Sequence, residues 1–436
     1  MSSRRGALHT RAVPRRPTQL TLLVLLSSLL GAAACAGAPA PRAEPPPARS
    51  APAPEPVAQA DAAVESEPAP VEPPPPAEPV ERAVTIGAGG DILCHLKVVR
   101  SAREHESGFD HVFGRLREVI GDDEVAFANL ETPLSERIDP ETGEPPVLGA
   151  PGSVAPALAA AGIDVVSVAN NHSYDQMATG LGDTLRALAD AQVGAAGASE
   201  DLDAAPGPVV IERDGVRVAV VAFTERVNRG PAVQGEYVRV ARYDDDAARA
   251  ALARARAQAD VVLLSIHWSH DFIETPRIAQ RERARLLVDA GADVIIGHGP
   301  HVLQEVERME SPRGDAVVAY SLGNLVSNQG LRYWAGRRIP ENMHPAVVLP
   351  TVRDGAWLRA RFVVSEDGLR IDSLTAVPLW TVNNYLDVAL DRADVLDVHV
   401  GPLREMPEEY RIERLPEIAA ALGQAVTIVE AAPSEE

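Results

Sequence analysis

Short apolar segments alternate with amphipathic ones between residues 83 and 380. Apolar runs typical of buried strands occupy residues 84–91, 125–128, 164–169, 261–267, 294–296 and 317–320. Segments with helical periodicity occupy residues 154–161, 180–191, 244–258 and 276–290. Residues 209–212 and 216–223 flank Asp214-Gly215, which favours a two-residue hairpin turn, and residues 345–380 indicate further strands. This alternation of strands and helices predicts an α/β domain.

The first 35 residues have the pattern of an export signal. Five arginines precede an apolar run at residues 20–30, and small residues then lead to Cys35. This order is typical of a signal peptide, and the run is short for a membrane span. We predict a lipoprotein signal peptide over residues 1–35, with Cys35 as the lipidation site. An ordinary signal peptide is the alternative, because Ala32 stands where a lipobox usually has leucine. Lipidation would make the protein an exported, membrane-anchored lipoprotein, periplasmic or at the cell surface.

The next segment has a composition that cannot form a core. Residues 36–82 are rich in proline, alanine and glutamate and contain no aromatic residue. We predict a disordered linker that carries the domain away from its anchor, and a leader without a role is the alternative. The folded domain is predicted at residues 83–384. Residues 385–436 are predicted to form an acidic, partly helical tail.

Charge and cysteine content narrow the classes of partner. The formal net charge of −21 repels nucleic acid, so we expect no nucleic-acid partner. The chain has two cysteines, and with Cys35 lipidated Cys94 has no partner for an internal disulfide. The fold must therefore rest on core burial.

Polar side chains follow the ends of the predicted strands. They are Asp91, His95, Asn129, Glu131, Asn171, His172, Asp175, His267, His298, His301 and Asn324. Each alone is also typical of a turn, a cap or a structural histidine. Together they mark the strand carboxyl ends, where open α/β sheets bind ligands. Carboxylate, imidazole and amide ligands favour zinc, manganese or iron, and two such ions bridged by a carboxylate would clamp a phosphate-like oxyanion and activate water.

Six blocks in this order resemble the CapA family of capsule and poly-γ-glutamate synthesis proteins. They are GDIL at residues 90–93, NLETPL at 129–134, VANNH at 168–172, SIHW at 265–268, GHGPHV at 297–302 and YSLGN at 320–324. The resemblance covers roughly residues 84–380. It implies a calcineurin-like metallophosphatase fold, in which two β-sheets form a sandwich flanked by helices.

The resemblance also implies roles for individual residues. The implied metal ligands, for two divalent ions, are Asp91, Glu131, Asn171, His267, His298 and His301. His172 is implied as the proton donor to the leaving group. Four residues are left open as members of the site: His95, Asn129, Asp175 and Asn324. The chain departs from the pattern at Leu93, where the superfamily has histidine, so a site with one metal or none is the alternative.

We therefore expect a surface-anchored protein of capsule or exopolymer biosynthesis or export that is a metal-dependent hydrolase of phosphoester-like or polymer substrates. A non-catalytic scaffold or polymer-binding subunit is the alternative. The implied partners are the membrane through Cys35, the capsule polymer and capsule synthase subunits. Arg332, Arg337 and Arg338 are candidates for lining a cleft that takes an anionic substrate.

Overall fold

The computed structural model describes residues 81–140, 147–200, 205–231, 238–336, 338 and 342–430. The predicted signal peptide, Cys35 and almost all of the predicted linker lie outside these residues. Among the described residues, no helix is both long and apolar enough to span a bilayer.

The strands are β1 (Arg82–Ile92), β2 (Val125–Leu130), β3 (Val165–Ser167), β4 (Gly194–Ala196), β5 (Ala198–Ser199), β6 (Val209–Arg213), β7 (Val216–Thr224), β8 (Arg239–Val240), β9 (Val261–His267), β10 (Val294–His298), β11 (Val306–Ser311), β12 (Gly314–Ala319), β13 (Asn324–Val326), β14 (Asp354–Ser365), β15 (Gly368–Asn383), β16 (Val398–Pro402) and β17 (Thr427–Ile428). The α-helices are α1 (Leu96–Glu104), α2 (Phe109–Phe113), α3 (Leu116–Ile120), α4 (Val154–Ala161), α5 (Met177–Asp190), α6 (Asp245–Arg256), α7 (Ile278–Asp289), α8 (Pro345–Val348), α9 (Tyr385–Ala389) and α10 (Glu408–Leu422).

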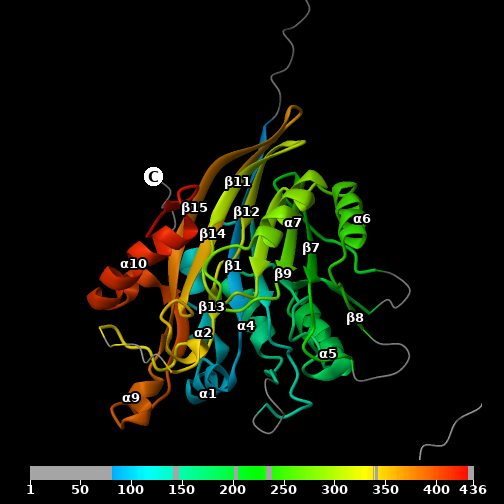
Figure 1. Cartoon of the computed structure of the whole chain (residues 1–436). Coiled ribbons are helices and arrows are strands. Elements are labelled where there is room, and N and C mark those ends of the chain that lie inside the picture. Colours follow the sequence, from blue (N-terminus) through cyan, green and yellow to red (C-terminus); the bar gives the residue numbers. More distant parts are fainter. Residues whose placement is uncertain are drawn as a thin grey trace, which may run out of the picture. The chain divides into compact units, whose positions relative to one another are not determined.

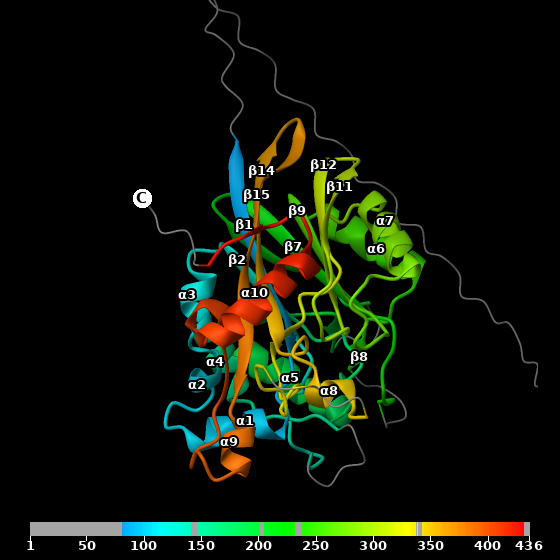
Figure 2. The same ribbon diagram turned by 60° about the vertical axis from the view of Figure 1, so that its left-hand side comes forward.

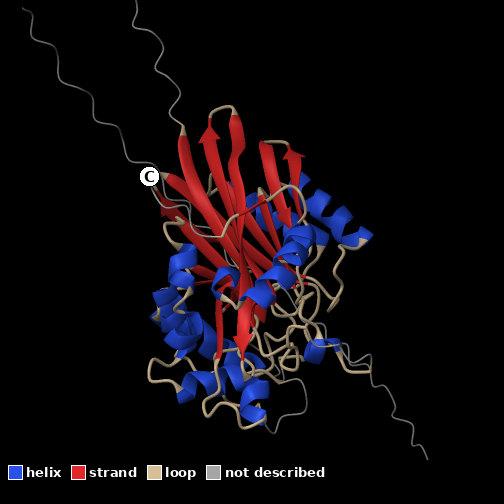
Figure 3. Ribbon diagram, turned by 90° about the vertical axis from the view of Figure 1, so that its left-hand side faces the viewer, coloured by secondary structure: helices blue, strands red, loops and turns tan. Residues whose placement is uncertain are grey.

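The strands form two layers that face each other (Figures 1 and 2). One layer has the order β4-β3-β2-β1-β14-β15, and the other has the order β12-β10-β9-β7-β6. The layers are joined where Gly314 of β12 pairs with Leu369 of β15, and β1 contacts β7 and β10 across the interior. Helices lie around the strands (Figure 3). The predicted α/β fold, a large sheet arrangement with flanking helices, is confirmed.

The central strands of the second layer have long apolar runs because they are buried on both faces. Strands β7, β9, β10 and β12 run parallel, and every residue of β9 and β10 is buried. Parallel strands are covered on both faces and so lack the alternation of half-exposed strands. One face packs on the interior between the layers, and the other packs on α6 and α7, where Leu252 and Leu287 belong to the same core cluster as Leu264 and Ile295.

Local signals set the ends of several elements where the sequence predicts them. The Asp214-Gly215 turn joins β6 to β7 with φ of 48° and 74°, the left-handed pair that a tight hairpin requires. Helix α6 begins after Asp244, whose side chain accepts hydrogen bonds from the N–H groups of Asp246 and Ala247.

The segment after residue 384 is integrated into the sheet. Strand β16 pairs antiparallel with β15, and α10 packs against β14. Arg414 of α10 donates two hydrogen bonds to the Asp354 carboxylate, at 2.6 and 3.2 Å, and both side chains are buried. This part of the chain therefore helps to hold the long β14–β15 hairpin in place.

Candidate metal centre

The strand carboxyl ends bring the predicted side chains to one buried place. In the first layer, β1 and β2 run parallel with Asp91 opposite Asn129, and Glu131 follows β2 directly. In the second layer, His267 at the end of β9 lies opposite His298 at the end of β10. Parallel strands end at the same edge of a sheet, so each layer contributes candidate ligands from neighbouring strands.

Asp91 connects the two layers. Its Oδ1 atom lies 3.2 Å from Nδ1 of His298, and its Oδ2 atom lies 3.1 Å from Nδ1 of His301. The Asn129 amide donates to Oδ1 at 2.8 Å, and the Gly299 N–H donates to Oδ2 at 3.2 Å. Asp91 is fully buried, and these contacts fix the orientation of its carboxylate.

Glu131 is the anomaly of the site. Its Oε1 atom faces three imidazoles, with Nε2 of His267 at 3.7 Å, Nε2 of His301 at 3.8 Å and Nε2 of His172 at 4.0 Å. Glu131 is fully buried, and neither of its oxygens has a hydrogen-bond partner among the described residues. A buried carboxylate without such partners is costly unless a cation compensates it.

Other potential metal-ligand atoms at the site also lack hydrogen-bond partners among the described residues. Oδ1 of Asn171 and Nε2 of His298 are buried without a hydrogen-bond partner in the described part of the chain. One ligand atom from each of Asp91, Glu131 and His267 lies within 4.8 Å of the others. Buried, unpartnered oxygen and nitrogen atoms that converge in this way fit a divalent transition-metal ion.

The electrostatics of the site reflect two carboxylates facing several imidazoles. Burial alone would raise the pKa of Asp91, but contacts with His298 and His301 outweigh it and hold that pKa well below its ordinary value. Burial raises the pKa of Glu131 well above its ordinary value. Burial would lower the pKa of His301, yet Glu131 and Asp91 raise it to about 9. Burial holds the pKa of His267 well below its ordinary value, so that ring is neutral and could serve as a metal ligand.

The GHGPH loop after β10 is wrapped tightly around His267. Gly299 has φ of 99°, and a Cβ atom there would lie 3.0 Å from Nε2 of His267 and 2.7 Å from the Trp268 carbonyl oxygen. His301 has φ of 59°, a left-handed conformation that is strained for a non-glycine residue. In this conformation the His301 ring faces both carboxylates, with Nδ1 on the side of Asp91 and Nε2 on the side of Glu131.

His172 has the geometry of an oriented acid or base. Its Nδ1 atom lies 2.6 Å from Oδ2 of Asp175, and its Nε2 atom points toward Glu131. The Asp175 carboxylate is buried and also accepts the Leu148 N–H at 2.8 Å. A carboxylate on Nδ1 fixes the orientation of the ring, so Asp175 serves to position His172.

The sequence around this site matches a known family. A sequence profile described as "Bacterial capsule synthesis protein PGA_cap" matches residues 85–329. The chain belongs to this family. This confirms the resemblance to the CapA proteins that the six sequence blocks indicate.

Individual relatives carry names from the same family. "Capsule biosynthesis protein CapA" of Bacillus anthracis is 30% identical over 254 residues, which cover 57% of this chain and 60% of that protein. "PGA biosynthesis protein CapA" of Bacillus subtilis is 28% identical over 243 residues, covering 55% and 62%. The match thus spans about three fifths of these relatives.

Solved structures show a looser likeness. A 5'-nucleotidase precursor from Thermus thermophilus has a TM-score of 0.42 at 12% identity, covering 69% of this chain and 54% of that chain. The calcineurin-like phosphoesterase YfkN from Bacillus subtilis has a TM-score of 0.38 at 14% identity, covering 69% and 91%.

The sequence does not decide whether Asn129, Asp175 and Asn324 belong to the site, and the structure gives each of them different contacts. Asn129 orients Asp91, and Asp175 orients His172. Asn324 donates from its amide to the Val352 carbonyl at 2.8 Å and to Gln329 at 3.0 Å, while its buried Oδ1 atom has no hydrogen-bond partner among the described residues.

His95 lies close to the centre without joining it. Its Nδ1 atom accepts the Asn328 N–H at 3.3 Å, and no contact with Asp91 or Glu131 is found in the described part of the chain. Burial, together with the nearby His172 and His301 rings, lowers the pKa of His95 to about 3.

The predicted arginines belong to a separate pocket. Arg332 and Arg338 line a cavity of about 460 Å³ together with Trp334 and Tyr385. Arg337 lies outside the described residues. The pocket falls beyond the stretch that the family profile matches.

Asn228 is a site residue that sequence reasoning missed. Its amide lies 3.5 Å from Nε2 of His172, and its N–H donates to the Asn171 carbonyl at 2.7 Å. It follows β7, another strand of the second layer, by four residues. That position at a strand carboxyl end was the available signal.

Proposed function

We propose that this chain is a divalent-metal-dependent hydrolase that acts in the assembly or export of a capsule or exopolymer of the poly-γ-glutamate type. The observation that carries the proposal is Glu131, a fully buried carboxylate without a hydrogen-bond partner among the described residues, facing three imidazoles. Family membership supports the process, and the convergent donors support the chemistry.

The residues that would hold two ions, of manganese, iron or zinc, are Asp91, Glu131, Asn171, His267, His298 and His301. Bound ions would polarise a substrate oxygen and lower the pKa of water. Asn129 and the Gly299 N–H hold the Asp91 carboxylate in place. His172 donates the proton that the leaving group takes up, from its Nε2 atom, while Asp175 keeps its Nδ1 atom engaged.

The substrate in this proposal is a phosphoester or an amide of an anionic polymer. The names of the two Bacillus relatives refer to capsule and PGA biosynthesis, which supports a polymer-related role. A polyanion would be repelled by a chain of net charge −21 unless local positive charge attracts it. The Arg332 and Arg338 pocket supplies such charge beside the aromatic Trp334.

A non-catalytic scaffold that binds polymer or capsule synthase subunits is the second candidate. Leu93 stands where the metallophosphatase pattern has a histidine. The formal net charge of −21 would also repel an anionic polymer substrate. These two observations favour the scaffold, whereas the unpartnered Glu131 carboxylate favours the enzyme.

Metal content decides between the two. We expect the purified full chain to hold close to two equivalents of manganese, iron or zinc by elemental analysis, and to hydrolyse a generic phosphodiester. The Asp91→Ala/His298→Ala variant is expected to lose both the metal and the activity while it keeps the circular dichroism spectrum of the folded chain. A wild-type chain without metal and without turnover would establish the scaffold instead.

We propose also that Cys35 anchors the protein to a membrane through lipid. Two features support this: the basic, apolar and small-residue order of residues 1–35, and the proline-rich spacer that follows. In a bacterial host, the wild-type chain is expected in the membrane fraction, and Cys35→Ala in the soluble exported fraction. A Cys94→Ala control should stay with the membrane, and equal partitioning of all three would contradict the anchor.

A further inference from the structure

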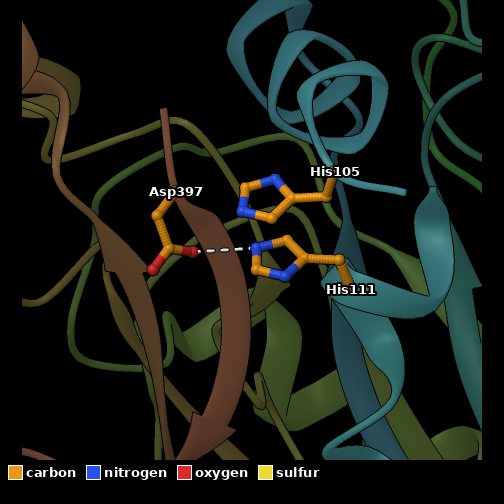
Figure 4. A group of neighbouring side chains, drawn as sticks. All are labelled: His105, His111 and Asp397. Atoms are coloured by element: carbon orange, nitrogen blue, oxygen red, sulfur yellow. Dashed lines mark hydrogen bonds and ion pairs between the residues drawn. The ribbon is translucent and has the colours of Figure 1, made fainter. Parts of the chain in front are cut away.

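A second cluster of metal-ligand side chains lies outside the centre described above. His105 ends α1, His111 lies in α2, Asp397 precedes β16 and His399 lies within it. Figure 4 shows the His105 and His111 rings stacked with one nitrogen of each turned toward Asp397. The ring centroids are 3.5 Å apart and the planes differ by 7°.

The donor atoms of this cluster converge. Oδ1 of Asp397 lies 2.9 Å from Nε2 of His111 and 2.6 Å from Nδ1 of His399. One ligand atom each from His105, His111 and Asp397 lies within 4.8 Å of the others. A tetrahedral zinc ion with bonds of about 2.0–2.2 Å needs ligand atoms about 3.3 Å apart. An imidazole binds an ion in its ring plane, so the stacked His105 and His111 rings must turn out of their parallel arrangement for both to bind one ion.

The His105 ring is held in the tautomer that a metal requires. Its Nδ1 atom lies 2.8 Å from the Ser101 carbonyl oxygen, which can only accept, so Nδ1 carries the proton. Nε2 therefore keeps its lone pair free for a ligand. A backbone carbonyl on the outer nitrogen is the usual support of a metal-binding histidine.

The backbone around Asp397 is equally fixed. Asn384 accepts the Asp397 N–H at 2.7 Å, and Ser101 accepts the Val398 N–H at 2.8 Å. Glu104 accepts the Leu396 N–H at 2.8 Å. The carboxylate is thus presented to the two rings by a loop tied to α1. The side chains of His111 and Asp397 are 19% and 35% exposed, which leaves an entry path for an ion.

We propose that His105, His111 and Asp397 form a second site for a zinc-like divalent ion, separate from the candidate metal centre, with His399 hydrogen-bonded to Asp397 beside it. Two imidazoles and one carboxylate supply three ligands of a tetrahedral set and leave the fourth position to water. The ion would join α1 and α2 to β16, and His111 and Asp397 are 286 residues apart in sequence. Because Asp397 and His399 lie beyond residues 85–329, it would fasten the C-terminal segment to the family-matched part of the domain.

The test uses the full chain carrying Asp91→Ala/His298→Ala, which removes two of the six proposed ligands of the first centre and so weakens zinc binding there. Equilibrium dialysis against Zn²⁺ is expected to leave one equivalent bound. The melting temperature is expected to rise by several degrees at about 100 times Kd, because the ion binds only the folded state. Adding His111→Gln and Asp397→Asn should remove both the equivalent and the shift.

The comparison variant is His344→Gln, an exposed histidine outside this cluster, which should keep both signals. No bound equivalent in the Asp91→Ala/His298→Ala background would overturn the proposal, whatever the wild-type chain binds. Zinc binding of unchanged stoichiometry and affinity after His111→Gln/Asp397→Asn would overturn it as well. A fall in the zinc-free melting temperature without any zinc-dependent difference would show that the four side chains form only a hydrogen-bonded clasp.

Discussion

Glu131→Gln is expected to lose the bound metal and the hydrolytic activity, and to unfold at a higher temperature than the metal-free wild type. Glutamine has nearly the same shape but carries no charge, so it cannot compensate a divalent ion. Replacing a group that merely supports a metal ligand weakens affinity by about 10–100-fold, and the loss of a ligand should exceed that. The fold gains because an unpartnered buried carboxylate, which costs about 1–3 kcal/mol or more, is removed.

Glu131→Gln should thus lower metal binding but raise the stability of the metal-free protein. These opposite effects distinguish a metal ligand from a residue that only supports the fold. Elemental analysis gives the metal content, and thermal unfolding of the metal-free proteins gives the stability. The matched control is Glu124→Gln, the same change just before β2 begins, where the Glu124 carboxylate accepts the Thr85 N–H. This control should keep its metal. A Glu131→Gln protein that is less stable than metal-free wild type, with unchanged metal content, would show that Glu131 serves the fold and not the ion.

Proton release gives the same prediction a second readout. Against the effect of burial, the Glu131 and Asp91 carboxylates raise the pKa of His301 to about 9, so its ring holds a proton at neutral pH when no ion is bound. An entering ion must displace this proton. Apparent affinity should therefore rise with pH, by up to about one order of magnitude per pH unit below pH about 9. Glu131→Gln removes a charge that raises the pKa of His301, so this rise should end at a lower pH.

The sequence predicted the strands of the domain better than its short helices. Strands β9 and β10 are buried on both faces, so their apolar runs cannot be mistaken for exposed chain. Helices α2 and α3 have five residues each and too few turns to show a helical period. Phe109 and Phe113 bury α2 in the core, and Leu116 and Ile120 bury α3 there, through tertiary contacts that local sequence does not reveal.

The candidate centre was predictable because its members sit at strand ends, a position that the chain pattern marks. The sequence pattern does not show which side chains of one layer contact which side chains of the other. The contact of Asp91 with His298 and His301 depends on how the two layers face each other. The cluster around His111 was beyond reach for the same reason, since Asp397 is 286 residues away and lies in a segment predicted as a tail.

His172→Gln is expected to lower kcat by about 10²–10⁴ while the metal content stays unchanged. The reason is positional: Nε2 of His172 points into the centre, and Asp175 holds Nδ1 at 2.6 Å. Glutamine can fill the space and make a hydrogen bond, but it cannot give up a proton at neutral pH. The loss should therefore fall on the chemical step and leave substrate binding largely intact.

The leaving group separates proton donation from a structural role. A nitrophenolate leaves without protonation, so His172→Gln should cost little with a bis(nitrophenyl) phosphodiester and the full factor with a dialkyl phosphodiester. Asp175→Asn should show the same dependence, because it misplaces the ring without removing it. An equal loss on both substrates would mean that His172 shapes the centre and does not donate the proton. Asn228 would then be the remaining polar group near Nε2 of His172 to test, since its amide lies 3.5 Å from that atom.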